Sequence, residues 1–557
     1  MDPAFPYPSS HWTEKLVRSA FYITLILAPV HWRMVLQSRL APAVYSDYAD
    51  FLLFLPDIAL LVMLVAWGFA RRANPKPLRL GPAFMWIPLA GLTAFAFISV
   101  FSSVDPALSL YHSIRLLLLF FFYLFIVNEQ ISIFAIALAV GLQCMLQSVV
   151  AIPQSILQRS VGLQVIGEYL LDPSWSGVSI ISDGATRILR AYGLSDHPNV
   201  LGGCLAFSLL VLLTVYLRGE RKNSLLLGIA FALLSLALLM TFSRSAWLAF
   251  LTGSVFIVGF EAKARGWASL KPVVPLFACA ILVALPFILL NANYFGARFN
   301  AGGSFEKVRS ERGAIEERLF LIEASNHIFS KHPLTGVGMS ASPLALRDEI
   351  PQLPETYHYQ PPHFTLLTVG LETGMFGAIF YFLLMILPWV TFSRRADLRA
   401  NPRVIGAMGL LLAVTIVGFF DYYTWFSTPG RIWQWLAWGL VAATINSPLP
   451  AKFDGEDASK FTAKSAKNAK KELKLGVLSG LRGSKNKMGA QPYPSQNPPL
   501  PAGEGLGVRA RSNHYDPPRH PLHPRHNNLL PRRHDPLHLR LELFIPLLSR
   551  VEKTRRA

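Results

Sequence analysis

Three arginines and two histidines, far apart along the chain, are the residues whose types and positions point most clearly to chemistry. Each lies beside a strongly apolar run: Arg190 and His197 in RAYGLSDHPNVLG, Arg244 in TFSRSAW, Arg318 in EERLFLIEASNHIF, and His363 in PPHFTLL. A guanidinium group binds phosphate through paired, charge-assisted hydrogen bonds. A neutral imidazole can accept a proton near physiological pH. Together the five side chains would suit a phosphate-bearing substrate and a hydroxyl that loses its proton.

The segment from 190 to 202 also has a purely structural explanation. Ser195 or Asp196 could cap the first turn of a helix that Pro198 begins, because proline is tolerated at the first helical position. Capping does not account for Arg190 or His197. A shared function for these two residues is indicated only if they lie close to the other three in the fold.

The other three residues have plain alternatives as well. Arg244 could extend its charged end to the membrane surface, and Arg318 could be a solvated charge among neighbouring glutamates. His363 could be a satisfied histidine at the membrane interface, followed by glycines at 370–377 that allow close helix packing. Only the convergence of all five on one side of the membrane favours a shared site for an anionic lipid headgroup.

The elements that position these residues are predicted to be membrane helices. Of the 557 residues, 52% are hydrophobic and only 15% charged, and the apolar runs reach the roughly 20 residues that span a bilayer. Segment 224–242 is apolar on every face, which excludes a β-barrel pattern. We expect an all-α polytopic membrane protein. The twelve predicted helices cover 16–36, 51–70, 82–101, 112–128, 131–153, 198–217, 224–242, 245–260, 272–291, 364–392, 404–421 and 430–446.

The distribution of Lys and Arg predicts which side each loop faces. Basic residues concentrate in the short loops 71–79, 218–222, 261–271 and 394–403, and such loops are typically cytoplasmic. Both termini of the transmembrane domain, residues 1–447, are then cytoplasmic. All five candidate residues fall on the opposite, outer side.

Two long segments, 154–197 and 292–363, are predicted to face outward. The first is rich in Gly, Ser and Ile without clear periodicity, so it indicates an irregular lid or re-entrant stretch. The second is the large outer loop, and its apolar residues recur at helical spacing among charges, which indicates an amphipathic helix. The apolar face would comprise Ile315, Leu319, Ile322 and Phe329.

Residues 448–557 form a basic tail of different composition. From residue 452 onward the tail holds 21 basic and 9 acidic side chains and is rich in Pro, His, Asn and Ser. Such a stretch cannot bury enough apolar surface to fold, so we expect a disordered cytoplasmic tail. Truncation after Pro450 should leave activity intact.

No metal site is predicted. Cys144, Cys204 and Cys279 lie far apart inside apolar runs and are interpreted as small buried hydrophobic residues. The histidines of the tail have irregular spacing that matches no set of metal ligands. We also expect no cofactor and no nucleic-acid partner.

The motifs around these residues resemble the O-antigen ligase and O-antigen polymerase family. Four patterns occur in the family's order, and each alone is weak. They are Arg190-x-x-Gly193 with His197-Pro-Asn199 and Leu201-Gly202; Ser243-Arg244; the loop helix with Arg318 leading into PLTGVG at 333–338; and His363 followed by Glu372, Gly374 and Gly377.

The resemblance implies a glycosyltransferase of the bacterial inner membrane. Such an enzyme moves a glycan from an undecaprenyl-diphosphate carrier to a hydroxyl of an acceptor glycan or lipid core, without a metal and with inversion at the anomeric carbon. Arg190, Arg244 and Arg318, together with His197, would bind the diphosphate and glycan. His363 would act on the acceptor hydroxyl as the catalytic residue.

The sequence departs from the family at one position and leaves alternatives open. Phe364 stands after His363, where the family usually has Asn or another small polar residue. Ligase and polymerase share these motifs and differ only in acceptor. A secondary transporter or a noncatalytic assembly protein that holds lipid-linked glycan are the alternative functions, although no similarity between the two halves of the chain supports transport.

Overall fold

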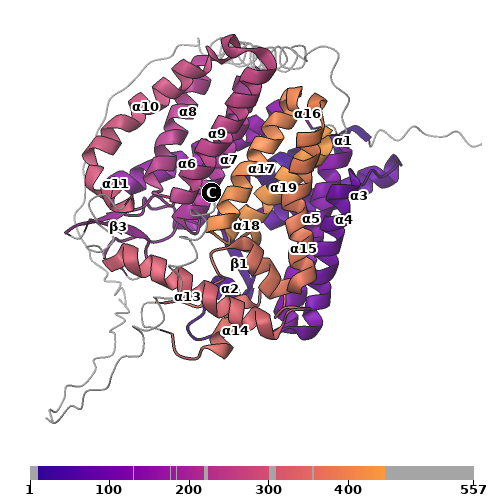
Figure 1. The fold of residues 1–557 in the computed structure, drawn as a ribbon, viewed down its shortest axis with the longest axis vertical. Coiled ribbons are helices and arrows are strands. Elements are labelled where there is room, and N and C mark those ends of the chain that lie inside the picture. The colour runs from indigo at the N-terminus through magenta and orange to yellow at the C-terminus, as the bar shows by residue number, and fades with distance from the viewer. Residues whose placement is uncertain are drawn as a thin grey trace, which may run out of the picture. The chain divides into compact units, whose positions relative to one another are not determined.

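The protein is seen in a computed structural model. It describes residues 10–129, 131–175, 177–183, 185–218, 224–299, 309–353 and 357–445. The tail predicted for residues 448–557 lies outside the described residues. The described part is a helical membrane protein with two short two-stranded sheets (Figure 1).

A helix occupies much of each of the twelve predicted ranges. These helices are α1 (Ser10–Leu27), α3 (Leu55–Ala73), α4 (Ala83–Ile98), α5 (Pro106–Asn128), α6 (Ile133–Leu157), α7 (Pro198–Tyr216), α8 (Ser224–Met240), α9 (Arg244–Arg265), α10 (Val273–Leu290), α15 (Thr365–Arg394), α17 (Pro402–Phe420) and α19 (Thr428–Ile445). Within the described ranges, 8 helices are long and apolar enough to cross a membrane. Because α1, α3, α8 and α19 are shorter or more polar, the number twelve stays a prediction.

The remaining elements connect these helices. They are α2 (Ser46–Ala49), α11 (Ala292–Arg298), α13 (Arg309–Lys331), α14 (Ser342–Glu349), α16 (Ala396–Ala400), α18 (Tyr423–Phe426), the short 3-10 helices η1 (Ser99–Ser102), η2 (Gln164–Ile166) and η4 (Trp267–Leu270), and the strands β1 (Arg33–Gln37), β2 (Phe51–Phe54), β3 (Ile180–Ser182) and β4 (Arg187–Leu189). β1 pairs antiparallel with β2, and β3 pairs antiparallel with β4.

The first two predicted helices are wrong at the ends that face each other. α1 ends at Leu27 because Pro29 follows, and a residue before proline is disfavoured in helical conformation. Beyond this point the chain forms β1, whose Val35 pairs with Leu52 of β2. α3 begins only at Leu55, with Pro56 in its first turn. A hairpin therefore stands where the two predicted helix ends would have been.

The predicted outer segments are more structured than expected. α6 continues to Leu157, so the first segment is shorter than predicted, and it contains the β3–β4 hairpin. The amphipathic helix is present as α13, but its buried face was predicted only in part: Phe329 packs against the apolar cluster beneath the helix. Leu321 and Ile328 are buried, whereas Leu319 is 62% exposed. Leu321 and Ile328 are seven positions apart, which keeps them on one face of a helix.

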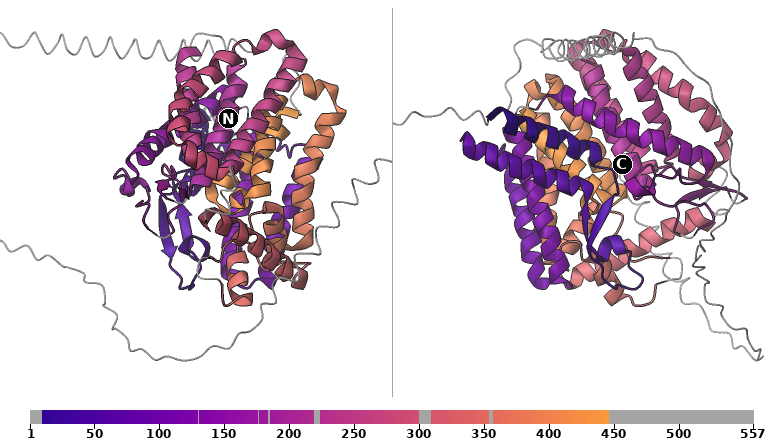
Figure 2. Two further views of the ribbon diagram at one scale, coloured as in Figure 1. Left: turned by 60° about the vertical axis from the view of Figure 1, so that its left-hand side comes forward. Right: turned by 180° about the vertical axis from the view of Figure 1, so that it is seen from behind.

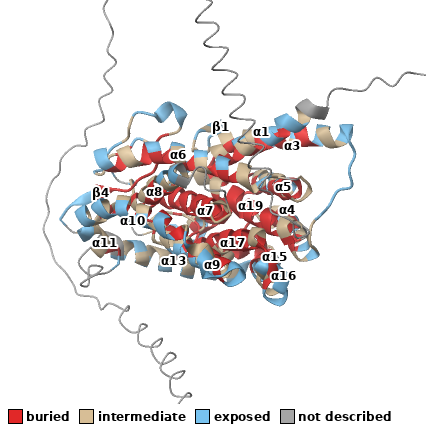
Figure 3. Cartoon of the chain, turned by 90° about the horizontal axis from the view of Figure 1, so that it is seen from above, coloured by how far each residue is buried: buried red, intermediate tan, exposed pale blue. Residues whose placement is uncertain are grey.

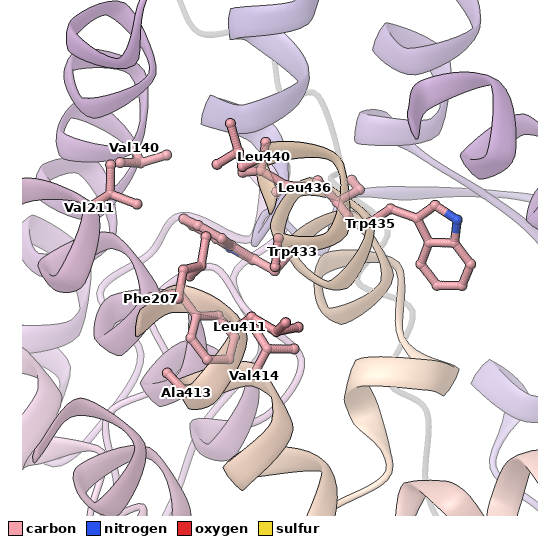
Figure 4. Packing of buried hydrophobic residues seen from close by; sticks show 14 of the residues in the cluster. Val140, Phe207, Val211, Leu411, Ala413, Val414, Trp433, Trp435, Leu436 and Leu440 are labelled. Atoms are coloured by element: carbon pink, nitrogen blue, oxygen red, sulfur yellow. The ribbon is translucent and has the colours of Figure 1, made fainter. Parts of the chain in front are cut away.

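The centre of the bundle is formed by α7, α17 and α19 (Figure 3). In α7, 89% of the apolar stretch is buried inside the protein. In the peripheral segment Trp267–Leu290, which contains α10, only 22% of this stretch is buried. Figure 4 shows Phe207 of α7 beside Trp433 of α19, with ring centroids 5.6 Å apart, and Leu411 and Val414 of α17 close by. Helices around such a core are held by packing of side chains rather than by exclusion of water. The core thus fixes the start of α7 and the end of α17, which border the site described below.

The cysteines agree in part with expectation. Cys144 and Cys204 are buried, and Cys279 is partly exposed. All three are free thiols, so the prediction of buried hydrophobic residues is confirmed for two of them.

Candidate functional site

The predicted site residues lie at one end of the helical bundle, which we call the site end. The starts of α7, α9 and α15 and the end of α17 lie there beside α13, α2 and β1 (Figures 1 and 2). The end of α1 is also there, because the backbone N–H of His31 donates to the carbonyl oxygen of Leu194 at 2.7 Å. Helix α1 therefore begins at the opposite end, and α19, which starts at Thr428 soon after α17 ends at Phe420, ends there. This arrangement agrees with termini on one side and chemistry on the other, while the orientation in a membrane stays a prediction.

Arg190 is built into the framework of the site. It follows β4 and is only 5% exposed. Its Nε donates to the carbonyl oxygen of Thr241 at 2.7 Å, and Nη1 donates to the hydroxyl of Ser179 at 2.8 Å. Its Nη2 donates to the side-chain oxygen of Asn199 at 2.5 Å. One guanidinium group therefore joins the first outer segment, the end of α8 and the start of α7.

His197, and not Ser195 or Asp196, caps helix α7. Its Nδ1 accepts a hydrogen bond from the backbone N–H of Asn199 at 3.1 Å, while Pro198 occupies the first turn as predicted. An accepting Nδ1 places the proton of the neutral ring on Nε2. Capping therefore does account for His197, contrary to the expectation from the sequence.

The ring of His197 is held in its neutral form. Burial, followed by the positive charges of Arg190, Arg318 and Arg298, lowers the pKa of His197 well below its usual value. Two of these three arginines were predicted to share its site. The electrostatic contacts therefore bring Arg190, His197 and Arg318 together.

Arg244 begins helix α9 and lies against Arg298, a residue that the sequence did not single out. Arg244 Nη1 donates to the carbonyl oxygen of Arg298 at 3.2 Å. Arg298 ends α11, is 9% exposed and donates through Nε and Nη2 to the carbonyl oxygen of Phe242 at 3.2 and 2.9 Å. The turn between α8 and α9 thus accepts hydrogen bonds from two guanidinium groups, that of Arg190 at Thr241 and that of Arg298 at Phe242. Arg298 belongs to a short helix that carries no motif, which is why the sequence offered no signal for it.

Arg318 differs from the other arginines of the site. It lies on α13 and makes no hydrogen bond or ion pair with any residue in the part of the chain that the structure describes. Nevertheless its charge acts on His363, His197 and the carboxylate of Asp421. Its donors thus remain available for an anionic ligand.

His363 precedes helix α15 and presents an unpartnered nitrogen. Its Nδ1 is buried and has no hydrogen-bond partner among the described residues. The ring meets that of Tyr422 edge to face, with centroids 4.9 Å apart. Burial, then the charge of Arg318 and the proximity of His197, lowers the pKa of His363 well below its usual value. A buried, neutral imidazole with a vacant nitrogen can accept a proton from a hydroxyl.

Asp421 is the acidic member of the site, and its partners could not be inferred from the sequence. Its Oδ2 accepts from Nδ2 of Asn199 at 2.8 Å, and Oδ1 accepts from the backbone N–H of Tyr422 at 2.9 Å. Its carbonyl oxygen accepts from the hydroxyl of Thr365 at 2.8 Å. Burial raises the pKa of Asp421. This residue ties the end of α17 to the starts of α7 and α15.

The PLTGVG and Glu-x-Gly-x-x-Gly patterns form one backbone joint between α13 and α15. The N–H groups of Val337 and Gly338 donate to the carbonyl oxygens of Leu371 and Glu372 at 2.8 and 3.1 Å, and Met375 N–H donates to the carbonyl oxygen of Pro333 at 2.7 Å. We call residues 333–338 and 371–375 the α13–α15 joint.

The joint depends on a break in helix α15. Gly374 has φ 75° and ψ 179°, a conformation that only glycine adopts readily. A Cβ atom there would lie 2.1 Å from the carbonyl oxygen of Leu334. This glycine was predicted to allow close helix packing. Its main role is to allow the break in α15 at which this helix bonds to residues 333–338. The joint in turn connects α13, which carries Arg318, to α15, which follows His363.

Phe364 lies at the start of α15, where no side chain caps the helix. Its ring stacks on that of Phe419 at 6.0 Å between centroids. Asn is among the residues that cap helices well. The departure from the family pattern therefore replaces a capping group by an aromatic contact between α15 and α17.

The part of the chain that the structure describes contains no group of three or more His, Cys, Asp or Glu residues that could hold a metal ion. The charge that acts on His363 is instead that of the guanidinium group of Arg318. Such a site can bind a polyanion, stabilise negative charge on a leaving group and accept one proton.

Comparison with known proteins gives one match. Residues 229–382 match the family model described as O-antigen ligase, and this range contains Arg244, Arg318 and His363. Arg190 and His197 lie before it. No curated protein matches the chain. The match, carried by a helical membrane protein, supports the assignment of this chain to the O-antigen ligase family.

Proposed function

We propose that the protein transfers a glycan from an undecaprenyl-diphosphate carrier to an acceptor hydroxyl on the outer side of the bacterial inner membrane. The observation that carries this proposal is the buried Nδ1 of His363, which has no hydrogen-bond partner among the described residues, together with the charge of Arg318 that acts on this ring. A membrane glycan-transfer function is supported by the family match. The carrier, the sidedness and the roles of individual residues are the proposal.

The chemistry follows from the charges around His363. The acceptor oxygen attacks the anomeric carbon while the bond from this carbon to the diphosphate oxygen breaks. The electron pair leaves with the diphosphate, and the hydroxyl proton passes to Nδ1 of His363. Attack from the face opposite the diphosphate inverts the anomeric centre. No metal is needed in this scheme, because guanidinium groups stabilise the departing charge.

The arginines take different parts in this scheme. Arg318 and Arg244 bind the diphosphate, Arg318 through its unpaired donors. Arg190 adds positive charge and holds the turn at Thr241 and the side chain of Asn199 in place. His197 keeps its Nε2–H available as a donor to the substrate.

Donor binding also prepares the base. In the free protein, burial and the charge of Arg318 lower the pKa of His363, so its proton affinity is low. A bound diphosphate would neutralise Arg318 and raise the pKa of His363, because a nearby negative charge favours the protonated ring. The site therefore becomes a better proton acceptor when the donor glycan is present.

Transfer by single-residue variants tests the proposal. We expect His363→Ala and Arg244→Ala to abolish transfer by purified protein supplied with lipid-linked oligosaccharide and acceptor, with products resolved by mass. His332→Ala and Arg312→Ala are the matched controls, because Arg312 lies exposed on α13 and His332 lies exposed directly after it. Near-normal transfer by both site variants would refute the assignment, and binding of the carrier without turnover by the unaltered protein would favour a noncatalytic assembly role.

The acceptor separates ligase from polymerase within this function. A strain that lacks the protein should accumulate unattached long chains if the protein is a ligase. It should make a short, single-repeat product if the protein is a polymerase. Glycan profiles of such a strain distinguish the two.

A further inference from the structure

A row of aromatic rings leads from His363 to the surface of the protein. The centroids of His363 and Tyr422 are 4.9 Å apart, those of Tyr422 and Tyr48 are 6.4 Å apart, and those of Tyr48 and Tyr45 are 5.7 Å apart. Tyr45 then stacks on His358 at 5.1 Å with an angle of 21°. We call these five residues the aromatic row.

The row is assembled from segments that the fold brings together at the site end. Tyr45 directly precedes α2, and Tyr48 lies within it. His358 and His363 precede α15, and Tyr422 precedes α18. Figure 1 shows α2, β1 and α18 next to one another. A bridge between Val44 and Tyr359 joins the first two segments. This pairing holds the segment of Tyr45 beside that of His358, and side-chain contacts join both segments to Tyr422.

Hydrogen-bonding groups accompany the rings. The hydroxyls of Tyr48 and Tyr422 are 2.7 Å apart, and the Tyr422 hydroxyl donates to the side-chain oxygen of Gln360 at 3.1 Å. Gln360 Nε2 donates in turn to Glu317 at 3.1 Å. Hydroxyl, amide and carboxylate groups thus line the same path as the rings.

Exposure increases along the row away from the site. Tyr45 is 43% exposed, and the side chain of His358 is 44% exposed. The buried Arg190 and Arg298 instead donate to Thr241 and Phe242, at the turn between α8 and α9. The aromatic row therefore reaches His363 from the segments around α2 and α18, and not from the α8–α9 turn to which these arginines bond.

We propose that the aromatic row is the binding site of the acceptor, a glycan chain whose reactive hydroxyl lies at His363 and whose further sugars pass along Tyr422 and Tyr48 to Tyr45. The proposal rests on the proposed transfer function and names its acceptor subsite. Aromatic faces carry partial negative charge and present a broad apolar surface, which suits the C–H faces of pyranose rings. The few polar groups beside them would bind sugar hydroxyls and set orientation.

Binding of lipid-free sugars tests this proposal separately from catalysis. The probes are oligosaccharide released by mild acid from the surface polysaccharide of the source strain and oligosaccharide from its lipid core, titrated into the full-length protein in lipid nanodiscs. We expect one of them to bind, and Tyr45→Leu to weaken it by about tenfold, as when an aromatic platform under a nucleic-acid base is removed. Tyr45→Phe keeps the ring and should bind as the unaltered protein does. Trp175→Leu, at an aromatic residue that is 53% exposed in the first outer segment, is the matched control.

Steady-state transfer adds a second readout. Tyr45→Leu should raise the KM for acceptor by about tenfold while the KM for the lipid-linked donor and the thermal unfolding midpoint stay unchanged. A raised donor KM with an unchanged acceptor KM would overturn the proposal and place the donor glycan on the row. An unchanged affinity, or a lowered unfolding midpoint with unchanged acceptor KM, would also overturn it, because the rings would then serve only packing or anchoring at the membrane interface.

The two proposals can fail independently. Loss of transfer in His363→Ala with intact oligosaccharide binding supports both proposals. If transfer depends on His363 but is unchanged by Tyr45→Leu, only the proposal of the acceptor subsite is refuted. If sugar binding depends on Tyr45 but the unaltered protein transfers no glycan, the proposed function is refuted. The bound sugar could then not be called an acceptor.

Discussion

Replacing Gly374 by alanine should release the α13–α15 joint. The backbone at this residue has φ 75° and ψ 179°, which costs a residue other than glycine roughly 1–3 kcal/mol. The new Cβ would also lie 2.1 Å from the carbonyl oxygen of Leu334. To relieve this clash the backbone must shift and lose the Met375–Pro333 hydrogen bond, which contributes about 1 kcal/mol. We therefore expect a destabilisation of about 3 kcal/mol, which is large for a single substitution.

The joint also sets the position of Arg318 relative to His363, so transfer should fall with stability. The assay is the thermal unfolding midpoint of the purified protein by tryptophan fluorescence, together with the rate of glycan transfer below that midpoint. Gly370→Ala is the matched control on the same helix, because its nearest contact would be Ala378 Cβ at an ordinary 3.4 Å. Alanine inside a helix is favoured over glycine by about 0.5–1 kcal/mol. Equal midpoints and equal rates for the two variants would refute the reasoning.

Two further predictions concern the charges of the site. Burial and Arg318 lower the pKa of His363 in the free protein, so the neutral base should persist below the pH at which histidines usually protonate. Arg318→Gln removes one cause of the lowered pKa and should move the acid limb of the kcat/KM profile, which reports the free protein, to higher pH. A limb that does not move would show that Arg318 does not act on His363. Asn199→Ala removes a group that bonds both Arg190 and Asp421, and it should destabilise the protein by roughly 1–3 kcal/mol because buried polar groups lose a partner. An unfolding midpoint equal to that of the unaltered protein would contradict this.

The sequence predicted the helices better than it predicted their ends. Segment 224–242 is apolar on every face, and such a run specifies a helix without help from neighbours. Residues 33–36 and 51–54 were mistaken for helix ends, because their apolar residues suit a strand as well as a helix. Pro29 ends the first helix before this stretch. The buried face of α13 was misplaced in part because α14 and α15 pack against this helix, and the spacing of apolar residues alone does not reveal which residues face them.

The chemistry-bearing residues were visible in the sequence, but their contacts were not. Arg318 and His363 stood out as charges beside apolar runs, and the structure brings them into one electrostatic group. Nothing in the sequence pairs Asn199 with Asp421, because a tertiary hydrogen bond between distant residues leaves no local pattern. Arg298 was missed for the same reason, as its partners are backbone carbonyl groups.

The link from Arg190 through Asn199 to Asp421 has a consequence for how the protein is made. Asn199 enters the membrane early in synthesis, whereas its acidic partner follows more than two hundred residues later. Until α17 has been inserted, the polar groups of Arg190 and Asn199 lack the carboxylate that balances them. The site is therefore completed only when synthesis of the membrane domain is nearly finished, and a nascent chain stalled before α17 leaves these buried polar groups without their acidic partner.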